Sequence, residues 1–324
     1  MPKNNLDQDF MREVKSFFLR EKEGNLGPYL YSESNPLITD DRVCGEEYYQ
    51  KIIYENPNYY LYKDEVALIQ ETADRLSDHV PADSTIIELG PGTEQAFLGK
   101  TIPFLKAAQP YQYIAVDLCE KYLVNAGKLV NDLFPGISIK TLKKDFFKDI
   151  DWMRDYKEAV VFFKGSTITN LDSGQCCGFL QAISQVLKPD GKLIVGIDSN
   201  QEERSLRLAY ENLDVSNFIL NIFQRINRDL PINLFDPDRF TYKFNWVSEE
   251  HCVKHQVVAV KAQEFELDGI PFEVAQGEVF HLMSSFKYPV DLFQSMAEQS
   301  GLIALDCYRN NNKRMGIHIL KAKT

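Results

Sequence analysis

The segment 88–93, with the sequence ELGPGT, holds two glycines directly after a predicted strand and directly before a predicted helix. Glycines at such a turn allow the backbone to approach a nucleotide closely. A dinucleotide-binding domain for hydride transfer prefers a third small residue at the sixth position counted from the first glycine. Gln95 occupies that position here. The turn therefore predicts a ligand that contains a nucleoside, and Gln95 disfavours a nicotinamide-dependent dehydrogenase.

Acidic residues also stand at the ends of the next two predicted strands. The first of these strands ends with Asp117, and the region of the second ends with Asp145 and Phe146. A carboxylate at a strand end can accept hydrogen bonds from both ribose hydroxyls, and ligands bind at the carboxyl ends of parallel strands. Asp145 can accept from an adenine amino group, and Phe146 can stack on the ring. Each feature alone also has an ordinary explanation: a plain turn for the glycines, a helix cap for Asp117 and a solvated loop for Asp145.

In this combination the segment resembles the cofactor loop of class I methyltransferases, in which an acidic residue precedes the glycines. Glu88 is that residue here. In that superfamily the loop holds the amino-acid part of S-adenosylmethionine. The resemblance therefore implies that Glu88, Gly90, Gly92 and Thr93 bind S-adenosylmethionine, with S-adenosylhomocysteine as the product.

Alternating strands and helices must position these residues. This order predicts an α/β fold with a parallel, doubly wound sheet, which is the Rossmann-like sheet of class I methyltransferases. The predicted strands are 84–90, 111–118, 137–146, 159–170 and 192–198, and the predicted helices are 93–108, 120–134 and 174–187.

In the rest of the chain, strands and helices do not alternate in this way. Residues 200–288 are predicted to form an inserted α+β lobe, to which the N-terminal segment also contributes. The predicted elements are an amphipathic helix at 5–22, an irregular stretch at 24–46, a helix from about 62 to 76, one or two helices within 204–230, antiparallel strands within 240–267, a turn at 269–271, one strand within 272–288, a helix at 289–301 and a terminal hairpin at 302–323.

Seven segments, in unbroken order from about residue 45 to the C-terminus, resemble the histidine Nα-methyltransferases of the ergothioneine pathway and related amino-acid methyltransferases. The G-S-T-I-x-N and N-R-D/E-L elements are the distinctive ones. The segments are PNYYLYKDE (57–65), ELGPGT (88–93), FFKGSTITNL (162–171), LAYEN (208–212), FILNIFQRINRDL (218–230), FDPDRF (235–240) and GEVFHLMSSFKY (277–288).

The resemblance implies an N-methyltransferase of two lobes with a small amino-acid substrate between them. It assigns 65–199 and 289–324 to the cofactor-binding domain, and 1–64 and 200–288 to the substrate-binding lobe. It further implies that Tyr59 and Asn170 hold the substrate α-amino group, that Tyr210 binds the carboxylate and that Gly165 lines the site through its backbone. Methyl transfer needs orientation and desolvation of the amine more than covalent help. The ordinary alternatives are core packing for Tyr59, helix capping for Asn170 and helix-surface packing for Tyr210.

Met283 marks a departure from the histidine enzymes of this family. Those enzymes grip the imidazole with a Glu and a Ser two residues apart, and the aligned positions here are Met283 and Ser285. A thioether is a poor acceptor for an imidazole N–H, and an unsatisfied buried donor is costly. His255 falls where the family has a methionine, and its ordinary alternative is a strand histidine that faces solvent. The segment upstream of Gly45, including Arg42, lacks the family's substrate-facing aromatic residue. These exchanges predict an acceptor other than histidine, with a larger, more apolar or differently charged side chain.

Composition excludes several other classes of partner. The chain has 324 residues, with 36 Lys and Arg against 47 Asp and Glu, a net charge of −11. This balance argues against nucleic acid and anionic membranes. The six cysteines lack C-x-x-C spacing, which argues against a zinc site. We expect a cytoplasmic monomer without a metal, a secretory segment or a transmembrane segment. A non-catalytic regulatory protein that binds S-adenosylmethionine on the same scaffold is the alternative.

Overall fold

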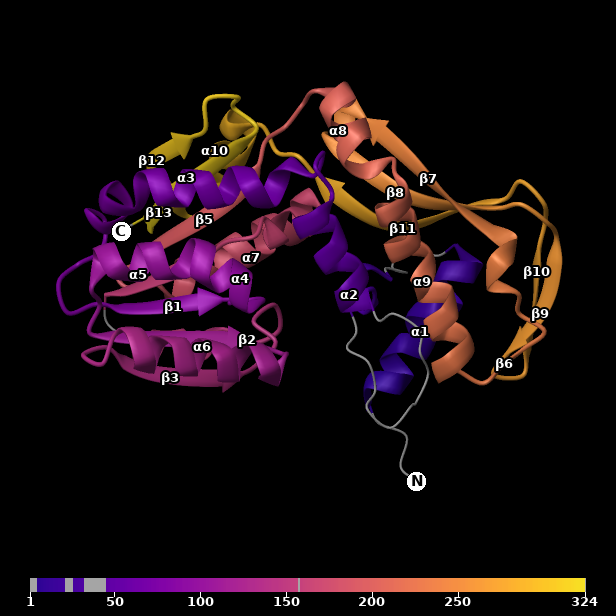
Figure 1. The fold of residues 1–324 in the computed structure, drawn as a ribbon, viewed down its shortest axis with the longest axis horizontal. Coiled ribbons are helices and arrows are strands. Elements are labelled where there is room, and N and C mark those ends of the chain that lie inside the picture. Colours follow the sequence, from indigo (N-terminus) through magenta and orange to yellow (C-terminus); the bar gives the residue numbers. More distant parts are fainter. Residues whose placement is uncertain (1–4, 21–25, 32–44, 157, 324) are drawn as a thin grey trace. The chain divides into compact units, whose positions relative to one another are not determined.

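The computed structural model describes residues 5–20, 26–31, 45–156 and 158–323. The chain divides into two compact units, which Figure 1 shows as ribbons. Unit 1 comprises Met1–Tyr60 and Glu202–Ser285, and unit 2 comprises Leu61–Gln201 and Phe286–Thr324. Arg42 and Cys44 lie outside the described residues.

Unit 2 is built on a seven-stranded sheet in the order β12-β13-β5-β4-β1-β2-β3. The strands β1 to β5 pair in parallel, and β13 pairs antiparallel with β5 and with β12. The predicted α/β class and the terminal hairpin are therefore confirmed. The strands are β1 (Thr85–Leu89), β2 (Gln112–Asp117), β3 (Ser138–Lys143), β4 (Ala159–Phe163), β5 (Lys192–Asp198), β12 (Leu302–Arg309) and β13 (Met315–Ala322).

Helices cover both faces of this sheet. Neighbouring residues of a strand point to opposite faces. On β4, Phe163 packs against Phe179 of α7 with ring centroids 5.6 Å apart, whereas Phe162 packs against Phe104 of α5 at 4.6 Å. The helices of unit 2 are α3 (Tyr60–Ser77), α4 (Glu94–Ala96), the π-turn η3 (Phe97–Thr101), α5 (Ile102–Ala108), α6 (Glu120–Leu133), α7 (Ser173–Val186) and α10 (Val290–Gln299), with 3-10 turns η4 (Asp151–Asp155) and η5 (Thr167–Asn170).

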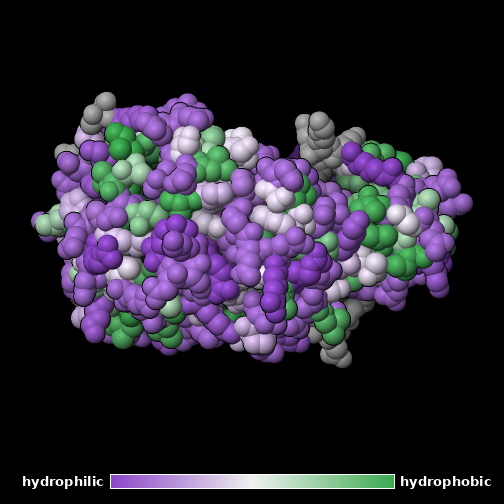
Figure 2. Space-filling view, turned by 90° about the horizontal axis from the view of Figure 1, so that it is seen from above, coloured by the Kyte–Doolittle hydropathy of each residue, from purple (hydrophilic) through white to green (hydrophobic). Residues whose placement is uncertain are grey.

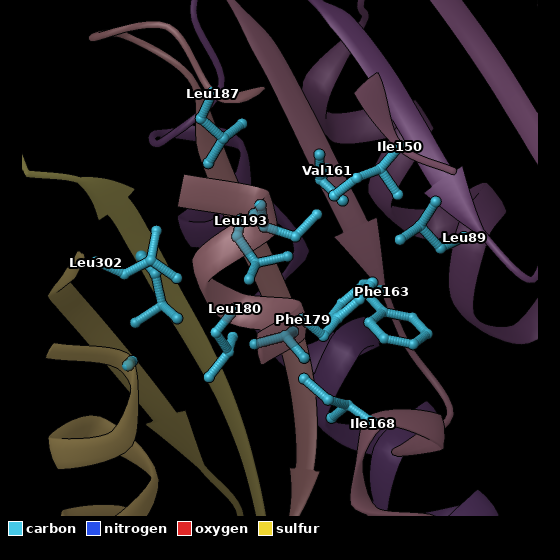
Figure 3. Packing of buried hydrophobic residues seen from close by; sticks show 14 of the residues in the cluster. Leu89, Ile150, Val161, Phe163, Ile168, Phe179, Leu180, Leu187, Leu193 and Leu302 are labelled. Atoms are coloured by element: carbon cyan, nitrogen blue, oxygen red, sulfur yellow. The ribbon is translucent and has the colours of Figure 1, made fainter. Parts of the chain in front are cut away.

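The core of unit 2 lies between the strands and α7. Figure 3 shows Val161 and Leu193 on neighbouring strands, with Leu180 of α7 close by and Leu302 of β12 beside them. These four side chains are 0% exposed. Burial of one such side chain contributes ~1.5–3 kcal/mol. The core therefore fixes the strand ends on which the predicted cofactor residues stand.

Unit 1 combines helices with two three-stranded sheets, β11-β8-β7 and β10-β9-β6. Its elements are α1 (Asn5–Leu19), η1 (Gly27–Tyr29), α2 (Gly45–Gln50), the π-turn η2 (Lys51–Glu55), α8 (Glu203–Tyr210), α9 (Leu213–Asp229), β6 (Ile232–Asn233), η6 (Pro237–Arg239), β7 (Phe240–Val247), η7 (Ser248–Glu250), β8 (Cys252–Ala259), β9 (Gln263–Leu267), β10 (Ile270–Val274) and β11 (Val279–Phe286).

Helix α1, from the N-terminal segment, packs against the part of unit 1 that follows residue 201. Its Phe18 lies with its ring 4.8 Å from that of Phe265 and 5.8 Å from that of Phe280. Phe223 of α9 stacks on Phe240 of β7 at 4.4 Å. The amphipathic pattern at the N-terminus therefore describes a helix that is docked into an aromatic core.

Four elements predicted from the sequence have other boundaries in the structure. The predicted turn at 269–271 lies earlier, at Asp268 and Gly269, because both have positive φ, and Ile270 already begins β10. The predicted single strand within 272–288 is divided between β10 and β11 in different sheets. Gly277, with φ of 83°, turns the chain between them, and Glu278 accepts a hydrogen bond from the backbone of Ala275.

The third error concerns the strand predicted at 159–170, which ends at Phe163. Gly165 and Ser166 have φ of 83° and 52°, so the chain leaves the sheet direction and enters η5. The helix predicted at 93–108 is also divided into α4, the wider turn η3 and α5.

None of the helices that the structure describes is long and apolar enough to cross a membrane. Polar side chains dominate the face shown in Figure 2, and hydrophobic ones lie there in separate groups. The five cysteines among the described residues are free thiols.

Candidate functional site

The glycine loop between β1 and α4 turns sharply at its two glycines and borders open space. Gly90 and Gly92 have φ of 74° and 72°, a region that side chains disfavour. The backbone N–H of Gly90 donates to the carbonyl of Val116 at 2.9 Å, which ties the loop to the neighbouring strand. A Cβ built on Gly90 would have no heavy atom within 4 Å, so the loop borders open space. Thr93 caps α4 by accepting from the N–H of Ala96 at 3.2 Å. This loop fits the close approach of a ligand such as S-adenosylmethionine.

Asp117 is the last residue of β2, and Asp145 lies two residues after the end of the adjacent parallel strand β3, where Lys143 lies opposite Asp117. Asp117 is half-buried, and its Oδ1 accepts from the N–H of Cys119, the N-cap residue of α6, at 2.8 Å. Burial raises the pKa of this carboxyl above its ordinary value. Asp145 holds the loop after β3 by accepting from the N–H of Phe147 at 3.1 Å. Phe146 is half-buried beside it. These side chains lie at the same edge of the sheet as the glycine loop.

The side chain of Glu88, two residues before Gly90, points into the protein interior and not into solvent. Its side chain is 0% exposed. It accepts hydrogen bonds from Thr101 at 2.7 Å and from Tyr113, and it forms an ion pair with Lys164 at 2.9 Å. Burial beside this carboxylate raises the pKa of Tyr113 well above its ordinary value. The protein therefore surrounds both carboxylate oxygens.

Gly165 and Asn170 lie in the turn that follows β4. The N–H of Gly165 donates to Oε1 of Glu65 on α3 at 2.7 Å. Asn170 ends η5 and is half-buried. Capping of α7 is performed by Asp172, whose carboxylate accepts from the N–H of Gln175 at 2.8 Å. The interpretation of Asn170 as the helix cap is therefore wrong.

In unit 1, three predicted substrate residues lie together. The rings of Tyr59 and Tyr210 meet edge to face at 5.7 Å, and Tyr210 lies 5.5 Å from the ring of His255. His255 is 4% exposed, so the alternative that it faces solvent is wrong. The hydroxyl of Tyr242 lies 2.9 Å from Nδ1 of His255.

Burial sets the protonation of this aromatic group. It raises the pKa of Tyr59 well above the ordinary value, and the nearby Tyr210 raises it further. Burial also raises the pKa of Tyr242. Both phenols therefore keep their protons at neutral pH and can act as neutral hydrogen-bonding groups.

Met283 and Ser285 stand two residues apart on β11, so they point to the same face of the strand. They are 7% and 8% exposed. Met283 therefore places a buried thioether on the same face of β11 as the hydroxyl of Ser285.

Sequence reasoning missed Glu65, Lys100, Lys164 and Tyr242. Lys164 had a signal, because it directly follows the apolar strand residues 159–163. Tyr242 had a weaker one, the alternation of apolar and polar residue types along the segment 240–246. Among the described residues, no group of three or more His, Cys, Asp or Glu is arranged to hold a metal ion.

A family model described as "Histidine-specific methyltransferase, SAM-dependent" matches residues 29–322. The chain is 28% identical over 251 residues to the histidine N-alpha-methyltransferase of Mycolicibacterium smegmatis, covering 75% of this chain and 76% of that protein. It is 25% identical over 302 residues to N-methyltransferase dtpB of Aspergillus flavus, covering 88% and 80% respectively. A crystal structure of an S-adenosylmethionine-dependent methyltransferase from Clostridium acetobutylicum matches at 16% identity and a TM-score of 0.46, covering 85% of this chain and 96% of that one.

Proposed function

Because this chain belongs to the family of S-adenosylmethionine-dependent histidine-specific methyltransferases, we propose that it methylates the α-amino group of an amino acid, or a close relative, whose side chain is not an imidazole. The methyl donor is S-adenosylmethionine, and the chain is an N-methyltransferase of that family. The observation that carries the proposed acceptor is the buried Met283.

The amine end of the proposed acceptor is held by Tyr59 and Asn170, and its carboxylate by Tyr210. The attacking amine must be neutral, and a neutral phenol such as Tyr59 can orient it without locking it as an ammonium ion. The raised pKa of Tyr59 supports this role, because a phenolate would favour the charged amine. When bound, S-adenosylmethionine supplies an electrophilic methyl group on a sulfonium. The residues of the chain contribute orientation and exclusion of water.

The side-chain end of the acceptor is proposed to meet apolar and aromatic groups. Met283 offers no carboxylate to an imidazole N–H, and the loss of a partner for a buried donor costs ~1–3 kcal/mol. The rings of Tyr210, Tyr242 and His255 in the same unit support an apolar or aromatic side chain on the acceptor. Such rings stack favourably on other rings or methyl groups.

A thermal-shift screen of the amino acids and simple amines, with S-adenosylhomocysteine present, tests this proposal. Ligands that bind only the native state raise its apparent stability. We expect an amino acid with an apolar or aromatic side chain to raise Tm more than histidine does. A shift by histidine as large as that by any other amino acid would overturn the proposed acceptor. As a control, Asn170→Ala in the presence of the best acceptor should abolish that shift while keeping the shift by S-adenosylhomocysteine alone.

A further inference from the structure

Four charged side chains are buried around the glycine loop of unit 2. Glu65 and Glu88 are each 0% exposed, and Lys100 and Lys164 are each 5% exposed. They form two ion pairs, Lys100 with Glu65, and Lys164 with Glu88. We call this set the buried charge network.

Burial of such charges is costly. Each ion loses several kcal/mol of hydration, and apolar side chains of similar volume often stabilise a fold equally well. The cost is visible at Lys100, whose pKa is lowered by burial despite the adjacent Glu65. Stability alone is therefore a weak reason for four buried charges at one place.

The contacts of the network point to a different role. The ammonium of Lys164 donates to the carbonyl of Pro91 at 2.7 Å and to that of Gly90 at 3.1 Å. Glu65, through Oε1, accepts from the N–H of Gly165 at 2.7 Å. One pair thus holds the glycine loop after β1, and the other holds the turn after β4. These are the two backbone segments that carry the predicted cofactor residues of the central strands.

We propose that Lys164 is a positioning residue for the methyl donor, and that it fixes the glycine loop in the conformation that receives S-adenosylmethionine. Glu88 acts through Lys164 by holding its ammonium beneath the two carbonyls, rather than by touching the cofactor. Glu65, held by Lys100, fixes Gly165 in the same way. The inference concerns the donor side, so it stands or falls independently of the acceptor proposed above.

The chemistry of the loop explains why a cation belongs there. The carbonyls of Gly90 and Pro91 point into the protein, because both accept from the buried ammonium of Lys164. A buried carbonyl without a donor is costly. Lys164 supplies donors to two such carbonyls at once, and its charge is balanced by Glu88. A methionine at this position fills similar space but donates to neither carbonyl.

The test is the affinity of the full chain for S-adenosylhomocysteine, measured by calorimetry alongside the thermal unfolding midpoint. Lys164→Met leaves Glu88 buried without its cation, so it is compared with the double variant Glu88→Gln/Lys164→Met, in which no charge is left unpaired. We expect the double variant to recover most of the lost Tm. We expect its Kd for S-adenosylhomocysteine to stay raised by about tenfold or more, because the loop carbonyls have still lost their donor.

A matched control is available in the same unit. Lys287 and Asp198 form a further ion pair outside the buried charge network, with both side chains 0% exposed and Nζ to Oδ2 at 2.9 Å. The double variant Asp198→Asn/Lys287→Met removes an equally buried pair at the end of β5, and should change the Kd for S-adenosylhomocysteine by less than about threefold.

A second readout separates positioning from general damage. In steady-state assays, Glu88→Gln/Lys164→Met should raise the KM for S-adenosylmethionine more than it lowers kcat at saturating donor. A double variant that binds S-adenosylhomocysteine as tightly as the wild type would overturn the proposal. So would an equal loss of affinity in the Asp198→Asn/Lys287→Met control. If Lys164→Met alone fails to fold, the double variant decides the question.

Discussion

Gly196→Ala is expected to disrupt the buried charge network, because a Cβ at this position of the sheet would displace the carboxylate of Glu65. Gly196 lies on β5, and a Cβ there would stand 2.2 Å from Oε1 of Glu65 and 3.0 Å from Cε of Met315. Contacts under 3 Å between such atoms are not tolerated, so Glu65 must move. Its carboxylate is held by Lys100 and by the N–H of Gly165, and its movement breaks these bonds.

The magnitude follows from what Glu65 would lose. Disruption of a buried ion pair costs ~3–5 kcal/mol. Part of this is recovered, because both partners remain and alanine itself lowers the entropy of the unfolded chain by ~0.4–1 kcal/mol. We therefore expect Gly196→Ala to lower the free energy of unfolding by ~2–4 kcal/mol.

Urea unfolding at pH 7.5 measures this loss, and Gly178→Ala is the matched control. Gly178 is exposed within α7, and a Cβ there meets no atom within 4 Å. Alanine at that position should raise the free energy of unfolding by ~0.5–1 kcal/mol. A free energy of unfolding for Gly196→Ala within ~0.5 kcal/mol of the wild-type value would contradict this expectation. So small a change is typical of substitutions at the surface, and it would mean that the side chain of Glu65 can move without losing its partners.

Asp117→Asn should weaken the binding of S-adenosylhomocysteine in calorimetry, yet leave the free energy of unfolding at pH 8 unchanged or higher. Because the pKa of Asp117 is raised in the native state, the native state loses stability as the pH rises from the pKa of the unfolded chain through that of the native state, and Asn removes this loss. A lower free energy of unfolding for the variant at pH 8 would contradict this. His318 is 0% exposed and burial lowers its pKa to about 3, so it is neutral when folded and charges on unfolding. Stability should therefore fall by up to ~1.4 kcal/mol per pH unit between about pH 6.5 and 3, and His318→Gln should flatten this limb in acid unfolding curves; an unchanged slope would count against it. Asn170→Ala should lower kcat/KM for the true acceptor by ~10²-fold, as expected when a reacting amine loses an orienting group, and unchanged turnover by mass spectrometry would sink its assigned role.

Local patterns in the sequence were sufficient to predict the sheet of unit 2. Its strands are short apolar runs that alternate with helices, and the terminal hairpin follows from two such runs around residues 310–314. The boundary errors arose where one backbone angle decides the path. Gly277 and Gly165 both turn the chain with positive φ, and nothing in the neighbouring residues distinguishes them from tolerated strand glycines.

The buried charges were harder to predict for a different reason. Lys164 finds Glu88 76 positions earlier in the chain, and Lys100 finds Glu65 35 positions earlier, so no local pattern connects either pair. The burial of His255 was hard to predict for the same reason, because it depends on packing against Tyr210 and Tyr242 and not on the residues of its own strand. The sequence was sufficient to predict the glycine loop and the strand ends at one edge of the sheet, but not the buried charged groups that hold this loop and the turn after β4.

We propose that the chain transfers a methyl group from S-adenosylmethionine to the amine of an amino acid other than histidine. The values of kcat/KM for histidine and for apolar and aromatic amino acids, measured by mass spectrometry with the wild type and with Met283→Glu, test this transfer most directly. We expect the wild type to prefer an apolar or aromatic acceptor. We expect Met283→Glu to shift the ratio of kcat/KM values towards histidine by about tenfold or more, the factor that one recovered buried hydrogen bond of ~1.4 kcal/mol supplies. A wild type that prefers histidine, or that turns over no amine while it binds S-adenosylmethionine, would contradict the proposal.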